Sequence, residues 1–506
     1  MMPFRFGTDA EFAAAREFLS ASGFATAAIC ERLGLKDLGQ FKPLGEGRAT
    51  PPEVHDRLDA LIRVFLDGMA VEEAVLAPLL GDEGLAALAT LRLVDRHPET
   101  PDRWAASVML YPMASLFVAS DLGVSAPGLF PRDELTRPDC VFPAITSNTH
   151  TFLQQLPTTP CERLLELCAG TGIAALAGAR VAGRAWATDI TERSTRFAEF
   201  NARLNGIDNV TALQGDLYAP VAGLTFDRIV AHPPYVPASG PQVIFRDAGA
   251  DGEEVFRRLI EGLPDHLEPG GRLYCTCMAT DRAGAKLENR IRGWLGEREA
   301  EFDLLVITHF ELPPTDYYLK LASMGTVPWG IAEQRSQLYK RLDAERILYL
   351  TLVAQRHGPR ASFSVRRENG EGAGAAEADA LVAWLTAVAD GSWLDRLAAA
   401  RPRLSGAARL VLSHEARNGD WTVSAAKVQV EHPFRRTVEL SLNAATLLTL
   451  FDGTATAAEQ LRRLRAGGAL PPEMPDAAFA KFLGEMVAEG VLSLDGEARA
   501  EAALAG

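Results

Sequence analysis

Residues 163–172 read RLLELCAGTG, an apolar run that ends in a loop with two glycines. A short apolar run of this kind is typical of a buried strand, and the residues from Ile173 to Val181 continue with helical character. Gly170 and Gly172 permit a tight turn, and they let the backbone approach a ligand closely because no Cβ blocks it. The stretch therefore predicts a strand, a ligand-binding loop and a helix. The glycine spacing alone does not name the ligand, because dinucleotide-binding domains and ordinary turns share it.

Short apolar runs and amphipathic segments alternate on both sides of this loop. We place helices at 192–205 and 252–266, and strands at 163–169, 184–190, 210–215, 227–231, 271–278, 302–309 and 347–354. Such alternation is typical of βαβ units in a mostly parallel sheet. The sequence therefore predicts an α/β fold, a doubly wound, Rossmann-like domain of seven strands.

We expect this domain to span residues 131–357 and to lie between two other modules. Residues 1–130 show apolar positions at helical spacing, so we expect a mainly helical, winged-helix-like N-terminal module. The polar, glycine-rich stretch 366–375 has the composition of a linker. A third module is then expected at 376–506.

The third module is expected to be α+β and resembles small winged-helix modules. Its pattern predicts a helix over 377–400, a hairpin over 410–430 that turns at Asn418-Gly419-Asp420, and closing helices over 456–465 and 476–489.

Composition excludes several classes of protein. The 506 residues carry a formal charge of −15, which disfavours a broad nucleic-acid surface, because phosphate binding relies on clustered Lys and Arg. No apolar stretch is long enough to span a membrane, and the first residues do not have the pattern of a signal peptide, so we expect a cytoplasmic protein. The six cysteines are scattered without metal-ligand spacing, and we expect neither a disulfide framework nor a metal site.

Acidic residues follow the second and third strands of the α/β domain. Asp189-Ile190 ends one strand and Gly215-Asp216-Leu217 ends the next. The carboxylate of Asp189 can accept hydrogen bonds from two ribose hydroxyls, and that of Asp216 can meet an adenine amino group. In open α/β sheets, ligands bind at the carboxyl ends of the strands, so we expect both residues beside the glycine loop. The alternative is that they are helix N-caps or turn residues.

A tetrapeptide, His232-Pro233-Pro234-Tyr235, follows the fourth strand. The two prolines have fixed φ and no N–H, so this loop offers carbonyl acceptors in a rigid frame. A planar nitrogen nucleophile would donate its N–H groups to such acceptors, and Tyr235 would cover its flat face. Neutral His232 can accept one hydrogen bond or act as a base near neutral pH. Alternatively, it only caps the strand end.

In this order, the glycine loop, the two acidic residues and the tetrapeptide resemble the class I S-adenosylmethionine-dependent methyltransferases. The resemblance is to the branch with an Asn-Pro-Pro-Tyr type motif, which methylates amide or amine nitrogens. The family position usually held by Asn or Asp is His232 here, which leaves the substrate class open. Residues 245–252, FRDAGADG, and the later Pro269-Gly270-Gly271 look like the corresponding segment of HemK-like protein-glutamine N-methyltransferases.

The resemblance implies a site for S-adenosyl-L-methionine, with S-adenosyl-L-homocysteine as product. The cofactor-binding residues that it implies are Glu166, Cys168, Ala169, Gly170, Thr171, Gly172, Asp189, Ile190, Gly215, Asp216, Leu217, His232 and, upstream, Thr149. His232, Pro233 and Tyr235 would be catalytic. His232, Pro234, Tyr235 and Arg246 would bind the acceptor, although Arg246 and Asp247 could equally form a simple loop ion pair.

The leading hypothesis is methyl transfer to a nitrogen of a peptide, protein or small molecule. A nucleic-acid base methyltransferase is an alternative, because the same tetrapeptide suits an extruded exocyclic amine, although the negative charge disfavours it. A second alternative is a cofactor-binding regulator without turnover, and His232 is the observation that favours it.

Overall fold

The computed structural model describes residues 2–42, 53–122, 137–238, 243–370, 372–471 and 473–494. The chain forms two compact units. The first comprises Met1–Glu299 and Glu311–Thr351, and the second comprises Ala300–Phe310 and Leu352–Gly506. Among the described residues, no helix combines the length and the apolar character needed to cross a membrane.

The first unit is built on a sheet whose strands follow the predicted positions closely. Their order is β12-β10-β9-β6-β7-β8, and the pairs β10–β9, β9–β6, β6–β7 and β7–β8 are parallel. The strands are β6 (Cys161–Leu167), β7 (Ala182–Asp189), β8 (Val210–Gln214), β9 (Phe226–Ala231), β10 (Leu267–Arg282) and β12 (Ala344–Arg356). The chain order reverses direction between β6 and β9, so the carboxyl ends of these two strands flank a topological switch point. The predicted α/β fold is confirmed.

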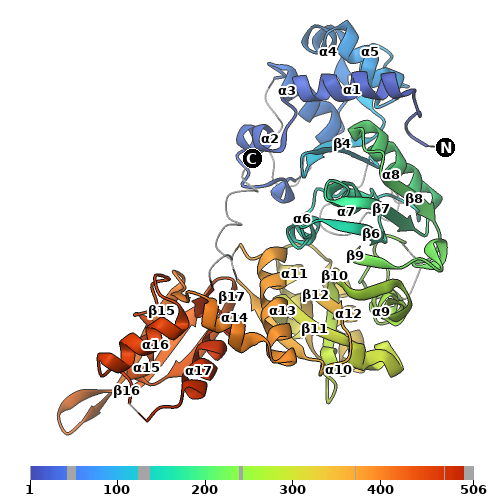
Figure 1. The fold of residues 1–506 in the computed structure, drawn as a ribbon. Helices are drawn as coiled ribbons and strands as arrows, with labels where there is room; N and C mark the ends of the chain where they lie inside the picture. Colours follow the sequence, from blue (N-terminus) through green and yellow to red (C-terminus); the bar gives the residue numbers. More distant parts are fainter. Residues whose placement is uncertain are drawn as a thin grey trace. The chain divides into compact units, whose positions relative to one another are not determined.

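Helices connect these strands (Figure 1). They are α6 (Ser147–Gln154), α7 (Ile173–Gly178), α8 (Glu192–Asn205), α9 (Glu254–His266), α10 (Leu287–Leu295), α11 (Pro314–Ser323) and α12 (Trp329–Arg341), with short 3-10 turns at Ala219–Val221 and Gly296–Glu301. Helix α8 has the predicted bounds because local signals fix both ends. The Thr191 side chain accepts from the Ser194 amide at the N-terminus, and Gly206 adopts the left-handed conformation at the C-terminus.

The N-terminal part of the first unit is helical with small antiparallel sheets. Its strands form a three-stranded sheet, β1-β3-β2, and a hairpin, β4-β5. The helices are α1 (Asp9–Ala21), α2 (Thr26–Leu33), α3 (Arg57–Leu61), α4 (Glu73–Leu80) and α5 (Asp82–Thr90), with a 3-10 turn at Leu38–Gln40 and a π-helical turn at Ile62–Leu66. The strands are β1 (Val71–Glu72), β2 (Val94–Arg96), β3 (Arg103–Ala106), β4 (Met109–Met113) and β5 (Leu116–Ser120).

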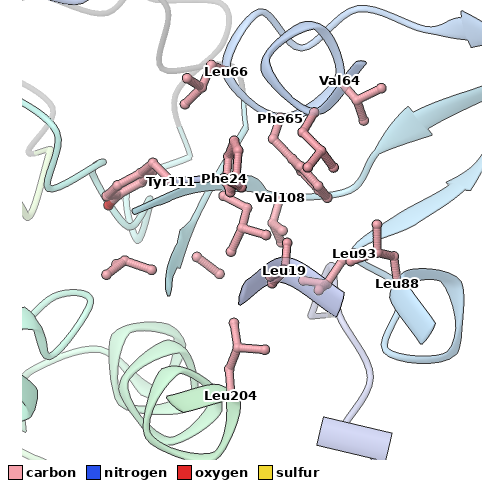
Figure 2. Packing of buried hydrophobic residues seen from close by; sticks show 14 of the residues in the cluster. Leu19, Phe24, Val64, Phe65, Leu66, Leu88, Leu93, Val108, Tyr111 and Leu204 are labelled. Atoms are coloured by element: carbon pink, nitrogen blue, oxygen red, sulfur yellow. The ribbon is translucent and has the colours of Figure 1, made fainter. Parts of the chain in front are cut away.

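One hydrophobic core joins this N-terminal part to the α/β sheet. Leu19 of α1 packs in the same buried cluster as Phe24, Phe65 and Leu204 of α8 (Figure 2). The ring of Phe4 lies 4.1 Å from that of Phe200, centroid to centroid. The two expected modules therefore share one compact unit. The expected boundary between residues 130 and 131 lies outside the described residues.

The second unit consists of a run of paired strands, a separate strand pair and a layer of helices. Its strand order is β15-β16-β17-β13-β11, with a separate pair β14-β18. The strands are β11 (Phe302–Leu312), β13 (Ser364–Asn369), β14 (Arg403–Leu404), β15 (Ala408–Arg417), β16 (Asp420–Val430), β17 (Phe434–Leu440) and β18 (Leu492–Ser493). The helices are α13 (Ala375–Asp390), α14 (Trp393–Ala399), α15 (Leu442–Leu448), α16 (Ala457–Ala466) and α17 (Asp476–Ala488).

Two expectations for this unit are wrong. The stretch 366–375 is not simply a linker, because its first residues belong to β13, which pairs with β11 and β17. Its Arg367 is buried and donates to the Ala488 carbonyl. The prediction was wrong because polar residues in this stretch are packed in a strand. The helix expected over 377–400 is two helices, because Gly391 has a φ of 83° and ends α13. The hairpin and the two closing helices are confirmed.

Candidate functional site

A cavity of about 420 Å³ lies in the first unit at the carboxyl ends of β6, β7, β8 and β9. Its size is in the range of small-molecule and cofactor sites. Most of the site residues predicted from the sequence line it, namely Thr149, Glu166, Cys168, Ala169, Gly170, Thr171, Asp189, Ile190, Asp216, Leu217, His232, Pro233, Pro234, Tyr235 and Arg246. Gly172 and Gly215 do not line it.

The glycine loop after β6 owes its shape to left-handed residues at alternate positions. Cys168, Gly170 and Gly172 have φ values of 56°, 54° and 76°. A Cβ added at Gly170 would meet no atom within 4 Å, so the backbone at this point faces open space. The loop therefore presents backbone atoms to a ligand in the cavity.

The two glycines of the loop have different tasks. At Gly172 an added Cβ would lie 2.8 Å from the Ala198 Cβ of α8. Gly172 is thus a packing glycine between the loop and α8, although it was predicted to contact the cofactor. Gly215 is similar, because an added Cβ there would lie 2.4 Å from Pro220 Cγ.

Glu166 anchors the loop onto the first turn of α7. Its two carboxylate oxygens accept from the amides of Ala174 (3.1 Å) and Ala175 (2.7 Å). These amides belong to the start of a helix, where backbone donors have no partner within the helix. Burial raises the pKa of Glu166 to about 8, against the lowering effect of the two amide donors. Glu166 therefore holds the backbone through both oxygens of its carboxyl group.

Asp189, at the end of β7, connects the glycine loop to the next helix. Its Oδ2 accepts from the Gly170 amide (2.9 Å), and its Oδ1 accepts from the Thr191 amide (3.0 Å) and hydroxyl (3.2 Å). The Oδ2 atom, which accepts one bond here, retains capacity for a further hydrogen bond. Asp189 therefore acts as a turn residue, as the alternative interpretation expected, and it also lines the cavity.

Asp216 lies at the cavity mouth in an ion pair with Arg258 of α9, at 2.6 Å. Both side chains are nearly half exposed, so the pair contributes little to stability. Its effect is to place a carboxylate and a guanidinium together at the cavity edge, since Arg258 also lines the cavity.

His232 places a neutral imidazole in the cavity wall. Its ring lies between Phe152 and Tyr235, at centroid distances of 5.3 and 6.0 Å. Burial lowers the pKa of His232 to about 4, so the ring is neutral at physiological pH. Its Nε2 atom is buried and has no hydrogen-bond partner among the described residues. A buried nitrogen of this kind is a strong candidate to bond a ligand.

Tyr235 is held by a contact that the sequence did not predict. The Asn148 side-chain amide of α6 donates to the Tyr235 hydroxyl at 2.7 Å, and the Tyr349 hydroxyl donates to the Asn148 carbonyl at 3.2 Å. The rings of Tyr235 and Tyr349 meet edge to face at 6.4 Å. Asn148 precedes Tyr349 by 201 residues, so no local pattern could have revealed the contact.

The predicted pair Arg246 and Asp247 combines both interpretations that the sequence allowed. Arg246 Nε donates to Asp247 Oδ1 at 2.8 Å, and both side chains line the cavity. Nearby, Phe142 and Phe245 stack at 4.8 Å. Arg246 is therefore an ion-paired wall residue, and Phe245 and Gly249 of the same segment also line the cavity.

Helix α11 supplies a tyrosine-rich wall. Tyr317 and Tyr318 both line the cavity, and the Tyr317 hydroxyl donates to the Met278 sulfur at 3.7 Å. Tyr318 stacks on Tyr339 of α12 at 5.8 Å. Two adjacent tyrosines are the one feature of the local sequence that indicates such a wall. Trp329, in the same segment, is 62% exposed and does not line the cavity.

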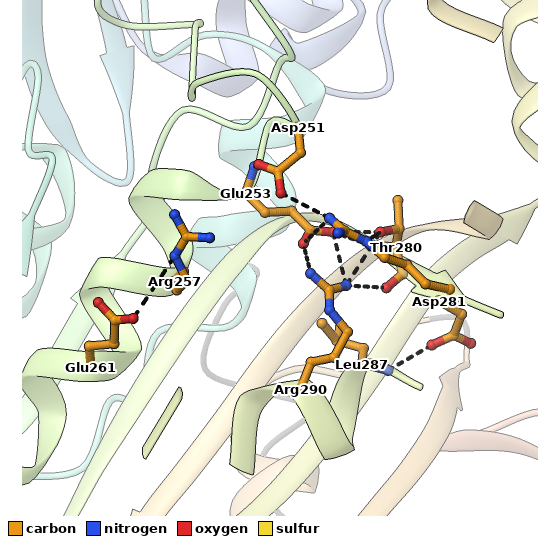
Figure 3. A network of polar contacts seen from close by, with 9 residues as sticks. Asp251, Glu253, Arg257, Glu261, Thr280, Asp281, Leu287 and Arg290 are labelled. Atoms are coloured by element: carbon orange, nitrogen blue, oxygen red, sulfur yellow. Dashed lines mark hydrogen bonds and ion pairs between the residues drawn. The ribbon is translucent and has the colours of Figure 1, made fainter. Parts of the chain in front are cut away.

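A buried ionic network fixes the start of α9 beside the cavity. Glu253 accepts from the Thr280 amide (2.8 Å) and hydroxyl (2.6 Å), and it pairs with Arg282 and Arg290 (Figure 3). The residue after it, Glu254, lines the cavity. Because each charge in the network is paired, the pairing offsets part of the desolvation penalty, and the network orients the start of α9.

Comparison with known proteins identifies the type of the α/β part. Residues 140–295 match the family described as Methyltransferase small domain. A ribosomal protein uL3 glutamine methyltransferase from Bradyrhizobium diazoefficiens is 37% identical over 131 residues, which cover 23% of this chain and 41% of that protein. A release factor glutamine methyltransferase from Moorella thermoacetica is 34% identical over 193 residues, covering 34% of this chain and 62% of that protein. The matches thus span less than two thirds of either relative.

A solved methyltransferase structure from Pyrococcus furiosus is 18% identical with a TM-score of 0.27, over 42% of this chain and 85% of that one. The family match bears out the resemblance drawn from the sequence motifs. Residues 140–295 of this chain therefore carry a methyltransferase small domain, similar to the HemK-like glutamine methyltransferases.

Proposed function

We propose that this chain is an S-adenosylmethionine-dependent methyltransferase that acts on an amide nitrogen of a protein. One observation carries the proposal. The glycine loop, Asp189, Asp216 and the tetrapeptide 232–235 line a single cavity at the switch point of a doubly wound sheet. The names of the similar proteins, which are glutamine methyltransferases, favour an amide of a protein over the other acceptors considered.

The residues present fit S-adenosyl-L-methionine. Gly170 turns bare backbone toward the cavity, and Asp189 keeps acceptor capacity beside it for ribose hydroxyls. Asp216, at the mouth, offers a carboxylate for an adenine amino group. When bound, the cofactor supplies an already activated methyl group on a sulfonium. The protein has to position the acceptor and exclude water.

The tetrapeptide would hold the acceptor nitrogen. The Nε2 atom of neutral His232 and the carbonyl of Pro233 are hydrogen-bond acceptors, and an amide nitrogen has two N–H donors. Because the pKa of His232 is about 4, its imidazole is not protonated at neutral pH and can accept a hydrogen bond. Tyr235, fixed by Asn148, would cover the flat face of the amide.

The test is incubation of the purified chain with methyl-labelled S-adenosylmethionine and a host extract, separated into protein, RNA and metabolite fractions. We expect label in protein and, by mass spectrometry, on a side-chain amide. His232→Ala is the control and should abolish the signal while cofactor binding, measured by calorimetry, persists. Label confined to RNA or to metabolites would refute the acceptor class. Cofactor binding without transfer to any fraction would instead support a regulator.

A further inference from the structure

The hairpin of β15 and β16 exposes large apolar side chains in the second unit. Leu410, Leu412, Trp421 and Val423 are 49%, 38%, 74% and 40% exposed. Single exposed apolar residues are ordinary, but several together on one element mark an interaction surface. The turn end of the hairpin stands clear of helices α15–α17 (Figure 1).

These side chains continue the core-facing side of the sheet. Leu410 pairs with Val428, and Leu412 pairs with Ala426. Residues directly opposite each other in an antiparallel pair point to the same face. Val428 and Ala426 are buried, and Val428 belongs to the core under the helices of this unit. The apolar face therefore extends past the point where the unit's own helices stop covering it.

Strand β15 also has an open edge. It is the terminal strand of its sheet, and among the described residues it pairs with β16 alone. Its ten residues include no proline, so nothing in its backbone prevents a further strand from pairing. An open edge next to an uncovered apolar face favours addition of another strand.

We propose that two copies of this chain pair through β15, antiparallel, about a two-fold axis at Leu412. In this register Leu412 lies opposite its own copy, and Arg409 lies opposite Glu415 of the second copy. By symmetry this opposite-charge pair occurs twice. A register centred on Ser413 would instead bring Arg409 against Arg417, and like charges directly opposite are destabilising. Of these two registers, only the one centred on Leu412 makes the charge pattern of β15 self-complementary.

The same symmetry would cover the exposed apolar face of the β15–β16 hairpin. A two-fold axis perpendicular to the sheet keeps both apolar faces on one side. Because the strands run in opposite directions, the helix-covered base of one hairpin lies beside the bare tip of the other. Each tip, with Trp421 and Val423, then lies next to the helical layer of the second copy. This pairing involves no residue of the cavity, so it does not depend on the proposed function.

Charge reversal tests the pairing in the full-length chain. We expect a dimer in sedimentation velocity, and we expect Arg409→Glu or Glu415→Arg to raise its dissociation constant at least about tenfold, since each replaces two attractive pairs by repulsive ones. The double variant should restore dimerisation, because it exchanges the charges across the axis. Glu439→Arg, on an exposed face of β17, is the control and should have no effect. A monomeric wild-type chain, or a dimer that both single variants leave intact, would overturn the proposal.

Cysteine cross-linking tests the register. Leu412→Cys should form a disulfide-linked dimer under mild oxidation, because the two residues 412 face each other. Val411→Cys should not, because Val411 faces Ser413 of the second copy. The unsubstituted chain controls for its six native cysteines. Cross-linking at 411 but not at 412 would refute this register, and capture of an added peptide by a monomeric chain would show that the edge serves a different partner.

Discussion

The two sides of the cavity differ in how their polar side chains are satisfied. On the glycine-loop side, both oxygens of Glu166 and both oxygens of Asp189 accept backbone amides. On the tetrapeptide side, the buried Nε2 of His232 has no partner among the described residues. On the first side, these carboxyl groups have hydrogen-bond partners without a ligand, so the glycine loop can hold its shape before a ligand binds. The second side lacks one hydrogen bond, which the proposed acceptor would supply.

The largest effect that this contrast predicts is at His232. We expect His232→Ala to slow methyl transfer about 10²–10³-fold, the range for loss of one positioned hydrogen-bonding group. Cofactor affinity should hardly change, because the glycine-loop side is complete without the imidazole. The measurement is the transfer rate at saturating cofactor, with affinity from calorimetry.

His232→Asn is the matched variant, because it places a carbonyl acceptor at this position. It should recover part of the rate that the alanine variant loses. A wild-type rate in the alanine variant would remove His232 from the site.

The next effect separates the two loop glycines. Gly172→Ala should destabilise the first unit by about 2–3 kcal/mol, because its Cβ would overlap Ala198 and its φ is positive. Gly170→Ala should cost only about 1 kcal/mol, because the added Cβ would contact no atom and the only cost is the strain of a positive φ. Thermal unfolding by circular dichroism compares them. Equal losses would contradict the assignment of Gly172 to packing.

A smaller effect is expected at Asn148, which holds Tyr235. Asn148→Ala removes one hydrogen bond to the hydroxyl, worth about 1 kcal/mol, so we expect a fall in transfer rate of about fivefold. Tyr235→Phe removes the other partner, and the double variant should be no slower than either single variant. Additive losses would show that the two residues act separately.

The smallest effect on the transfer rate concerns pH. Burial lowers the pKa of His232 from 6.5 in the free side chain to about 4. The folded state therefore resists protonation, and stability that is full above about pH 6.5 should decline as the pH falls toward 4, because the unfolded chain binds the proton more readily. The ratio of wild-type to His232→Asn rates should stay constant between about pH 6 and 8. A change in that ratio with a midpoint near 6.5 would show that the imidazole titrates normally.

The sequence predicted the sheet and most of the cavity because both depend on local signals. The apolar runs mark β6 to β10, and most of the predicted ligand residues stand at strand ends, where topology alone brings such residues together. Contacts between distant segments could not be predicted. Asn148 meets Tyr349 across 201 residues, and Phe4 meets Phe200 in the shared core. The packing of Gly172 against Ala198 could not be predicted for the same reason, because it joins the loop to a separate helix.

The shared core also sets a limit on how this protein can be taken apart. Phe197 and Phe200 of α8, inside the matched segment 140–295, are fully buried, and residues of the first α-helices belong to the cluster that buries them. A fragment trimmed to the family match would expose these rings to water, and we expect it to aggregate when expressed alone. Evolutionary transfer of the matched segment to other proteins would need the same N-terminal cover or a substitute for it.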